Sequence, residues 1–346
     1  MSKLWVAILL TVLLGAAEPS SKDQEDMQDV LRRYLKGVND CDASAVKSAI
    51  TSDFVTRFSW TRALGGRLLP SPEACSPGRV SFEVAALARF FRSATDSVVL
   101  SDAYFRTVGM AGGDQAGRLY VAFVKGSLGW RIFQLRFHPS RFERPFIAVE
   151  PARGHDVPGA DGWVTLFDGS STDRFQDANG DSFPETWRVE EGTLRAVASG
   201  SGHSLRTKDT YGSFDLRFEW KAPPKGNSGV KYRLFYILET PRGGSDGAGF
   251  EYQVVDDAGD PGAIRSPAER SGALYNQIAP SGAHIRPLGD YNESRIVVRG
   301  RHSEHWLNGA KVVEFEAESQ PPESPILIQH HETDFWFRNI RIRRLD

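Results

Sequence analysis

Cysteine, net charge and long apolar runs are all scarce in this 346-residue sequence. Cys41 and Cys75 are its only cysteines, and an oxidising compartment would let them pair if the fold brings them together. The 42 basic and 44 acidic residues nearly cancel, and no basic stripe alternates with aromatic residues. Nucleic acid is therefore not an expected partner.

The N-terminus has the pattern of a secretory signal peptide. Lys3 supplies a positive start, residues 4–14 form an apolar run too short to span a bilayer comfortably, and Gly15, Ala16 and Ala17 offer a cleavage site. No cysteine stands there to carry a lipid. We expect residues 1–17 to be removed and the mature protein to be exported, periplasmic or secreted, with no membrane span. An uncleaved membrane anchor is the alternative.

The first half of the chain favours an α+β domain over residues 22–140. Apolar residues recur at helical spacing through residues 24–38, and a shorter helix is expected near 43–50. Residues 118–123 and 130–137 alternate around glycines, which predicts an antiparallel hairpin. Prolines and glycines then predict a linker over residues 141–162.

The second half, residues 163–346, is predicted to be all β. Short strand-like runs alternate with Gly, Pro, Asn and Asp, and helical periodicity is weak throughout, which is typical of an antiparallel sandwich. The sharpest local signal is Asn308-Gly309, because a two-residue hairpin turn needs positive φ at both positions.

Seven phrases of the second half resemble one known family in order and spacing. They are LFDGSS at 166–171, GNSGVKYR at 226–233, FEYQVVDD at 250–257, SGALY at 271–275, EHWLNG at 304–309, LIQHH at 327–331 and WFRNIRIRRL at 336–345. Together they resemble the 3-keto-disaccharide hydrolases, which implies a concanavalin A-like jelly-roll sandwich. The first half resembles the cone-shaped SnoaL-like and nuclear-transport-factor-like domains, through the SDF turn at 52–54 and the strand that closes the hairpin. For this first domain we expect scaffolding or oligomerisation.

The resemblance implies an enzyme that cleaves oligosaccharides or glycosides already oxidised at C3. A C3 ketone acidifies the hydrogen on C2, so that a base removes it and the aglycone leaves C1 by β-elimination; addition of water then gives net hydrolysis. The site must supply a base, donors for the developing enolate oxygen and an acid for the leaving group. No nucleotide cofactor is implied.

Alternation along two strands gathers polar residues on one sheet face. Phe250, Tyr252 and Val254 are expected in the core, with Glu251, Gln253 and Val255 outward on a solvent-facing side. The same alternation places Gln329 and His331 together. If these strands share a concave sheet, Glu251, Gln253, Gln329 and His331 meet in one groove.

Within this set the catalytic candidates are Glu251, His331 and His305. Either Glu251 or His331 is the base and His305 the acid, or all three hold a divalent metal ion that polarises the ketone. Six residues are expected to bind substrate: Gln253, Gln329, Arg233, Asp256, Tyr275 and Trp336. Strand parity favours His331 over its neighbour His330.

Several positions depart from known patterns. Lys231 stands where the family usually has an apolar residue, and we interpret it as a solvated neighbour. Glu251, Gln253 and Asp256 resemble the ExDxxE strand of sandwich endoglucanases with the middle acid replaced by an amide, which weakens a double-displacement mechanism. The loop that begins at Asp177 resembles part of a calcium loop, but Arg188 occupies the position of the bidentate acid.

The competing interpretation is a carbohydrate-binding module without activity, since the same sandwich face binds glycans in other proteins. Trp306 and Trp336 would then be stacking platforms.

Overall fold

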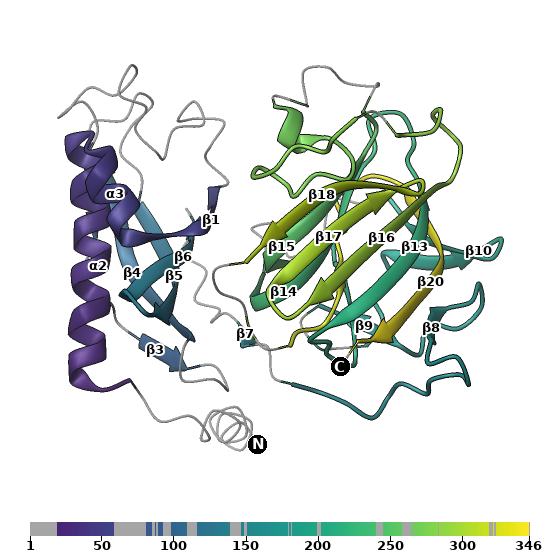
Figure 1. Ribbon diagram of the computed structural model, residues 1–346, viewed down its shortest axis with the longest axis horizontal. Coiled ribbons are helices and arrows are strands. Elements are labelled where there is room, and N and C mark those ends of the chain that lie inside the picture. The colour runs from purple at the N-terminus through teal and green to yellow at the C-terminus, as the bar shows by residue number, and fades with distance from the viewer. Residues whose placement is uncertain are drawn as a thin grey trace, which may run out of the picture. The chain divides into compact units, whose positions relative to one another are not determined.

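A computed structural model supplies the structure (Figure 1). It describes residues 19–58, 81–84, 87, 89–92, 98–108, 116–138, 147–148 and 151–345, the last range with gaps at 179, 181, 199–201, 240–244, 258–263, 265, 283, 318–320 and 322. The predicted signal peptide lies outside the described residues. No helix among the described residues is both long enough and apolar enough to cross a membrane. The chain divides into two compact units, residues 1–143 and 144–346.

The first unit has α+β structure. Helix α2 (Ser21–Asp40) begins at Ser20, whose side chain accepts a hydrogen bond from the Asp23 N–H, and α3 (Ala43–Ala49) begins at Asp42. The six strands are β1 (Ile50–Phe58), β2 (Ser81–Val84), β3 (Arg89–Arg92), β4 (Val98–Val108), β5 (Ala116–Gly126) and β6 (Gly129–His138). They form a sheet in the order β1-β6-β5-β4-β2, with β3 also paired to β4.

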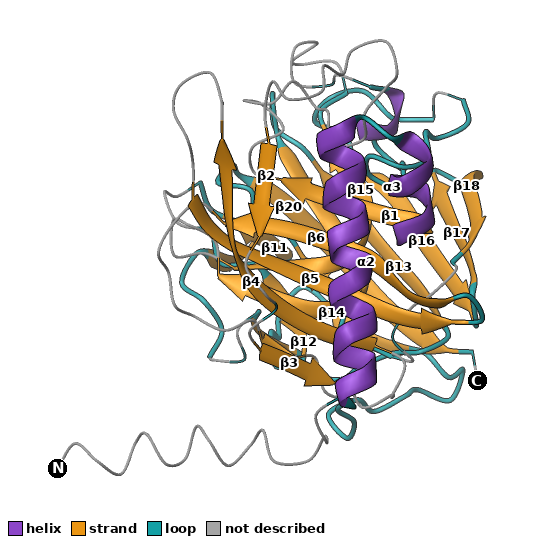
Figure 2. Cartoon of the chain, turned by 90° about the vertical axis from the view of Figure 1, so that its left-hand side faces the viewer, coloured by secondary structure: helices purple, strands orange, loops and turns teal. Residues whose placement is uncertain are grey.

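The apolar stripe of α2 is buried against this sheet (Figure 2). The predicted hairpin is confirmed, since β5 and β6 pair antiparallel from Arg118–His138 to Gly126–Gly129. Cys41 takes part in a disulfide, while Cys75, the chain's other cysteine, lies outside the described residues.

The second unit consists of two antiparallel sheets. The larger has the order β10-β11-β20-β13-β16-β17-β18, with β8 also paired to β20. Its strands are β8 (Val164–Phe167), β10 (Trp187–Glu190), β11 (Thr193–Ala196), β13 (Phe214–Lys221), β16 (Asn292–Arg299), β17 (His302–Leu307), β18 (Ala310–Glu316) and β20 (Phe335–Arg344). The predicted hairpin turn joins β17 to β18, with φ of 48° at Asn308 and 85° at Gly309.

The smaller sheet has six strands in the order β15-β14-β19-β12-β9, with β7 paired to β14. Its strands are β7 (Ile147–Ala148), β9 (Phe175–Asp177), β12 (Leu205–Thr207), β14 (Asn227–Glu239), β15 (Ser245–Val255) and β19 (Leu327–Ile328), and the short 3-10 helix η1 (Pro267–Glu269) follows β15. The two sheets pack face to face through rings such as Phe218 and Tyr252, whose centroids are 5.7 Å apart. The second unit is thus a β-sandwich.

Part of the predicted linker is bound to this sandwich. Asp209 is buried, and its carboxylate accepts hydrogen bonds from three successive backbone N–H groups, those of Gly154, His155 and Asp156. Thr210 exchanges further hydrogen bonds with Ala152. Residues 152–156 therefore belong to the folded body of the second unit.

Candidate functional site

The strand alternation expected around Glu251 is correct, but the exposure expected for it is wrong. Phe250, Tyr252 and Val254 are buried in the core, as expected. Glu251 and Gln253 do lie on the opposite face of the smaller sheet, but each is only 4% exposed. We call this side of the sheet the Glu251 face. It is a covered surface and not a solvated one.

The distal part of the β14–β15 hairpin lies over Lys231 on this side of the sheet, where the Gly247 carbonyl oxygen accepts a hydrogen bond from the Lys231 ammonium. The pairing of the two strands shifts register between Tyr232 and Tyr236, and Arg233 has a left-handed φ of 54°. Beyond this irregularity, Leu234 and Ile237 pack with Leu327 and Ala178 in a small buried cluster. Ser245 forms an isolated bridge with His203 beside β12. The hairpin therefore bends back over the strands next to β14.

Lys231 is buried under this cover, so its interpretation as a solvated neighbour is wrong. It lies directly opposite Glu251 in the β14–β15 ladder and is 0% exposed. Its Nζ lies 3.5 Å from Glu251 Oε2 and donates to the Gly247 carbonyl oxygen at 3.4 Å. Glu251, which the sequence placed on a solvent-facing side, is thus part of a buried ion pair.

Gln253 has a buried side-chain oxygen, Oε1, that lacks a hydrogen-bond donor among the described residues. Its Nε2 donates to Asn227 Oδ1 at 3.3 Å, whereas its buried Oε1 has no hydrogen-bond partner among the described residues. A buried acceptor without a donor is uncommon in folded proteins. The carbonyl end of Gln253 is thus a buried acceptor whose hydrogen bond is not made within the described part of the chain.

Three more predicted residues border the Glu251 face. Gln329 continues the pairing of β19, its N–H donating to the Gly229 carbonyl oxygen at 2.8 Å. His331 follows on the same strand side and is exposed. The half-buried Tyr275 pairs with the edge of β15 through its N–H, which donates to the Glu251 carbonyl oxygen at 3.0 Å.

His305 is not on this face; it lies in the core between the two sheets. Its Nε2 lies 2.8 Å from the Tyr232 hydroxyl, and its Nδ1 lies 3.0 Å from the Gly272 carbonyl oxygen. Burial lowers the pKa of His305 to about 4, so the imidazole is neutral at pH 7. The expectation that strand β17 turns His305 toward Glu251 is wrong, because β17 belongs to the larger sheet.

The metal site expected from Glu251, His331 and His305 is not assembled, because Glu251 and His305 lie on opposite faces of β15 and its neighbours. In the described part of the chain, the three ligating side chains that come together are His302, Glu304 and Glu314, on β17 and β18. Lys311 Nζ already contacts both of those glutamates. The residues present do not fit the divalent ion that the sequence suggested.

Arg233 and Trp336 also lie elsewhere. The Arg233 guanidinium donates to the carbonyl oxygens of Pro321 and Gly300 at 2.8 and 2.9 Å. Burial lowers the pKa of Arg233 to about 10, which still leaves it charged at neutral pH. Trp336 lies on the outer side of the larger sheet, where Lys221 and Arg195 lie over its ring at 4.8 and 5.5 Å. Trp336 therefore belongs to a different sheet from Glu251.

His330, the rival of His331, is held in place by its surroundings. It is buried, its Nε2 lies 3.0 Å from the Val197 carbonyl oxygen, and its Nδ1 accepts from the Glu332 N–H at 3.1 Å. Burial lowers the pKa of this imidazole. His330 is therefore a neutral packing residue, which agrees with the parity argument.

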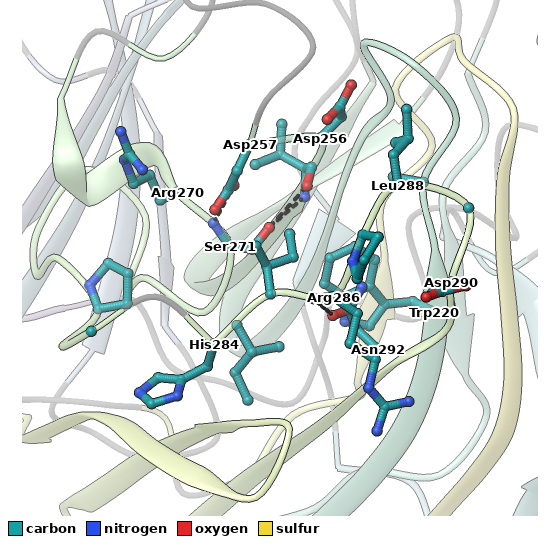
Figure 3. A pocket seen from close by; sticks show the side chains of 18 residues that line it. Trp220, Asp256, Asp257, Arg270, Ser271, His284, Arg286, Leu288, Asp290 and Asn292 are labelled. Atoms are coloured by element: carbon teal, nitrogen blue, oxygen red, sulfur yellow. Dashed lines mark hydrogen bonds between the residues drawn. The ribbon is translucent and has the colours of Figure 1, made fainter.

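A pocket of about 490 Å³ opens where β13 and β15 end and β16 begins. Asp256, which the sequence assigned to substrate binding, lines this pocket, with Asp257, Trp220 and Asn292 (Figure 3). Burial raises the pKa of Asp257. Glu251, Gln253, Gln329 and His331 are not among the residues that line this pocket.

The family model for the 3-keto-alpha-glucoside-1,2-lyase-like domain matches residues 162–343, and the chain belongs to this family. The resemblance noted from the seven phrases is therefore confirmed.

The chain is also similar to several individual proteins. A 3-keto-disaccharide hydrolase of Bacteroides thetaiotaomicron is 27% identical over 231 residues, 54% of this chain and 80% of that protein. The crystal structure of a candidate glycosyl hydrolase from Parabacteroides distasonis is 25% identical, covers 54% of this chain and 95% of its own, and gives a TM-score of 0.47. A nuclear transport factor 2-like protein of Salmonella enterica covers 36% of this chain and 96% of its own, with 11% identity and a TM-score of 0.29.

Proposed function

We propose that this protein is an exported enzyme that cleaves 3-keto-glycosides, including 3-keto-disaccharides, by removing the C2 proton and eliminating the aglycone from C1. The observation that carries the proposal is the buried Glu251 carboxylate beside Gln253, whose Oε1 has no donor among the described residues. The name of the Bacteroides relative and the family supply the substrate class.

Glu251 is the proposed base. Its carboxylate takes the proton from C2, and the electron pair of that bond moves toward the C3 oxygen to give an enolate. As the ketone re-forms, a double bond forms between C1 and C2 and the bond from C1 to the aglycone oxygen breaks. Water added across the new double bond gives net hydrolysis. A base with a fixed position commonly contributes a hundredfold or more, on the order of 10²–10⁴.

Gln253 and Gln329 are proposed to bind substrate hydroxyls, and Tyr275 to flank the sugar at the edge of β15. His331 is the proposed acid, because it is exposed beyond the end of β19 and histidine is the side chain that most often serves in general acid–base catalysis. It would protonate the departing aglycone oxygen.

The test compares 3-keto glucosides with ordinary glucosides on the mature protein. We expect aglycone release from the ketones alone and a loss of at least about a hundredfold in turnover for Glu251→Gln. Binding of either sugar without release would instead favour the carbohydrate-binding module. Equal cleavage of both substrates would reject elimination, since unoxidised sugars lack the acidified C2 hydrogen.

Export is part of the proposal and has its own test. The charged start, the short apolar run and the small residues before Glu18 motivate cleavage near Ala17. Mass spectrometry of the exported protein should give an N-terminus near Glu18. An intact Met1 on exported material would contradict it.

A further inference from the structure

Lys231 is a fully buried charged residue on the Glu251 face. Its two cross-strand neighbours are Glu251 on β15 and Leu327 on β19. Leu327 belongs to the small buried cluster under the bent hairpin, and Lys231 itself is 0% exposed. Its ammonium lies 3.5 Å from the Glu251 carboxylate and donates to the Gly247 carbonyl oxygen at 3.4 Å.

A buried ion pair contributes little to the folding free energy of a sheet. Both ions lose their hydration, and exchanging a buried ion pair for apolar side chains of similar volume is often neutral or stabilising. Packing alone therefore gives no reason for an ammonium next to Leu327. The position of Lys231, 3.5 Å from the proposed base, does give one.

The divalent ion expected beside Glu251 does not fit the residues that surround it. Of the ligand set predicted for that ion, His305 is in the core and hydrogen-bonded to the Tyr232 hydroxyl and the Gly272 carbonyl oxygen. The positive charge that contacts Glu251 belongs to the chain's own Lys231.

We propose that the Lys231 ammonium is the fixed positive charge of the reaction centre and takes the place of a divalent metal ion. The inference rests on the proposed function of Glu251. Lys231 acts through Glu251 and is therefore a positioning residue: it holds the carboxylate in one orientation and transfers no proton.

Charge stays balanced through the reaction. Before the reaction, the ammonium is paired with the Glu251 carboxylate. When the carboxylate takes the C2 proton it becomes neutral, and one negative charge appears on the C3 oxygen of the substrate. The ammonium is unchanged and keeps the site neutral, which favours the enolate in a buried, weakly polar environment.

The test uses full-length protein in four forms: wild type, Lys231→Met, Lys231→Arg and the double variant Lys231→Met/Glu251→Gln. Lys311→Met is the matched control, because Lys311 also pairs with glutamates but on the outer side of the larger sheet. Each form is assayed with a 3-keto glucoside before and after exhaustive chelation. Bound metal is measured by elemental mass spectrometry, and the melting temperature is recorded.

We expect the wild type to keep its full rate after chelation and to contain less than about one-tenth of a metal ion per chain. Lys231→Met should lower kcat at least about a hundredfold with KM within about threefold, because only the orientation of the base is lost. Lys231→Arg should recover at least about tenfold of that loss, and Lys311→Met should match the wild type.

Two results would overturn the proposal: a stoichiometric metal whose removal abolishes wild-type activity, or wild-type kcat in Lys231→Met. If Lys231→Met does not fold, the activity of Lys231→Arg and the metal content of the wild type test the proposal. The charge-neutral double variant then shows whether the Glu251 face tolerates apolar side chains at position 231. Full activity of Glu251→Gln would instead reject the proposed function itself, so the two failures are distinguishable.

Discussion

The Glu251 carboxylate lies directly against Gly229, which pairs with Gln253 in the β14–β15 ladder and is a diagonal neighbour of Glu251. A Cβ atom placed on Gly229 would come 2.4 Å from Glu251 Oε1 and 2.9 Å from its Cδ. Real Cβ contacts are essentially never that short, so the carboxylate keeps its place because residue 229 has no side chain. The second glycine of the GNSG phrase is thus explained by the space that Glu251 needs.

Gly229→Ala should therefore displace the carboxylate while leaving the sandwich folded. We expect turnover to fall about a hundredfold, as small misplacements of a reacting group commonly cause. Gly126→Ala is the control, since a Cβ there meets nothing within 4 Å. Steady-state kinetics measure the turnover of both variants, and circular dichroism shows whether they are folded. Unchanged turnover in a folded Gly229→Ala protein would mean that Glu251 is not the base.

Substitutions of the adjacent His330 and His331 should have different effects: one should lower stability and the other should lower activity. His330→Ala removes two buried hydrogen bonds and should cost roughly 2 kcal/mol of unfolding free energy. His331→Ala, on an exposed side chain, should leave stability unchanged and lower turnover about a hundredfold. Urea unfolding and kinetics of the two variants test this. A loss of turnover in His330→Ala and a loss of stability in His331→Ala would instead make His330 the acid.

Acid should destabilise the sandwich through His305. The pKa of His305 in the folded protein, about 4, lies below the ordinary histidine value of 6.5, so the unfolded chain binds the proton more readily between these two pH values. Stability is then fully present above about pH 6.5 and falls as pH drops toward 4, by up to roughly 3 kcal/mol.

Urea unfolding at pH 7 and pH 5 tests this effect on the wild type and on His305→Gln, which cannot take up the proton. The wild type should lose more stability than the variant between the two pH values. Equal losses in both proteins would show that other groups cause the acid sensitivity.

The start of the second unit should matter to its stability. A fragment of residues 162–346 lacks β7 and the backbone N–H groups that bind the Asp209 carboxylate, whereas residues 144–346 keep both. We expect both fragments to fold and to cleave 3-keto glucosides. The longer should be more stable by about 1–3 kcal/mol, because a buried carboxylate without donors is costly. Equal urea midpoints would contradict this.

Local patterns predicted much of the architecture. The helical stripe that begins at Met27, the β5–β6 hairpin and the Asn308-Gly309 turn follow from periodicity and from positive φ, which act over a few residues. Alternation likewise placed Tyr252 and Glu251 on opposite faces of β15.

The environment of the site could not be predicted in the same way. The hairpin that covers Lys231 is irregular at Arg233, which has a left-handed φ of 54°. The sequence has no glycine at this position, so it does not predict the left-handed conformation. His305 was misplaced because alternation assigns a side chain to a face of its own strand and does not say which of two sheets the strand joins. Both errors concern pairings between segments far apart in the chain.

The central claim is that Glu251 removes the C2 proton, and isotope incorporation tests it most directly. Cleavage of a 3-keto glucoside in deuterated water should give a product labelled at C2, at a rate lowered about a hundredfold in Glu251→Gln. An enzyme-free reaction corrects for spontaneous exchange beside the ketone. Aglycone release with the C2 hydrogen fully retained would contradict the account.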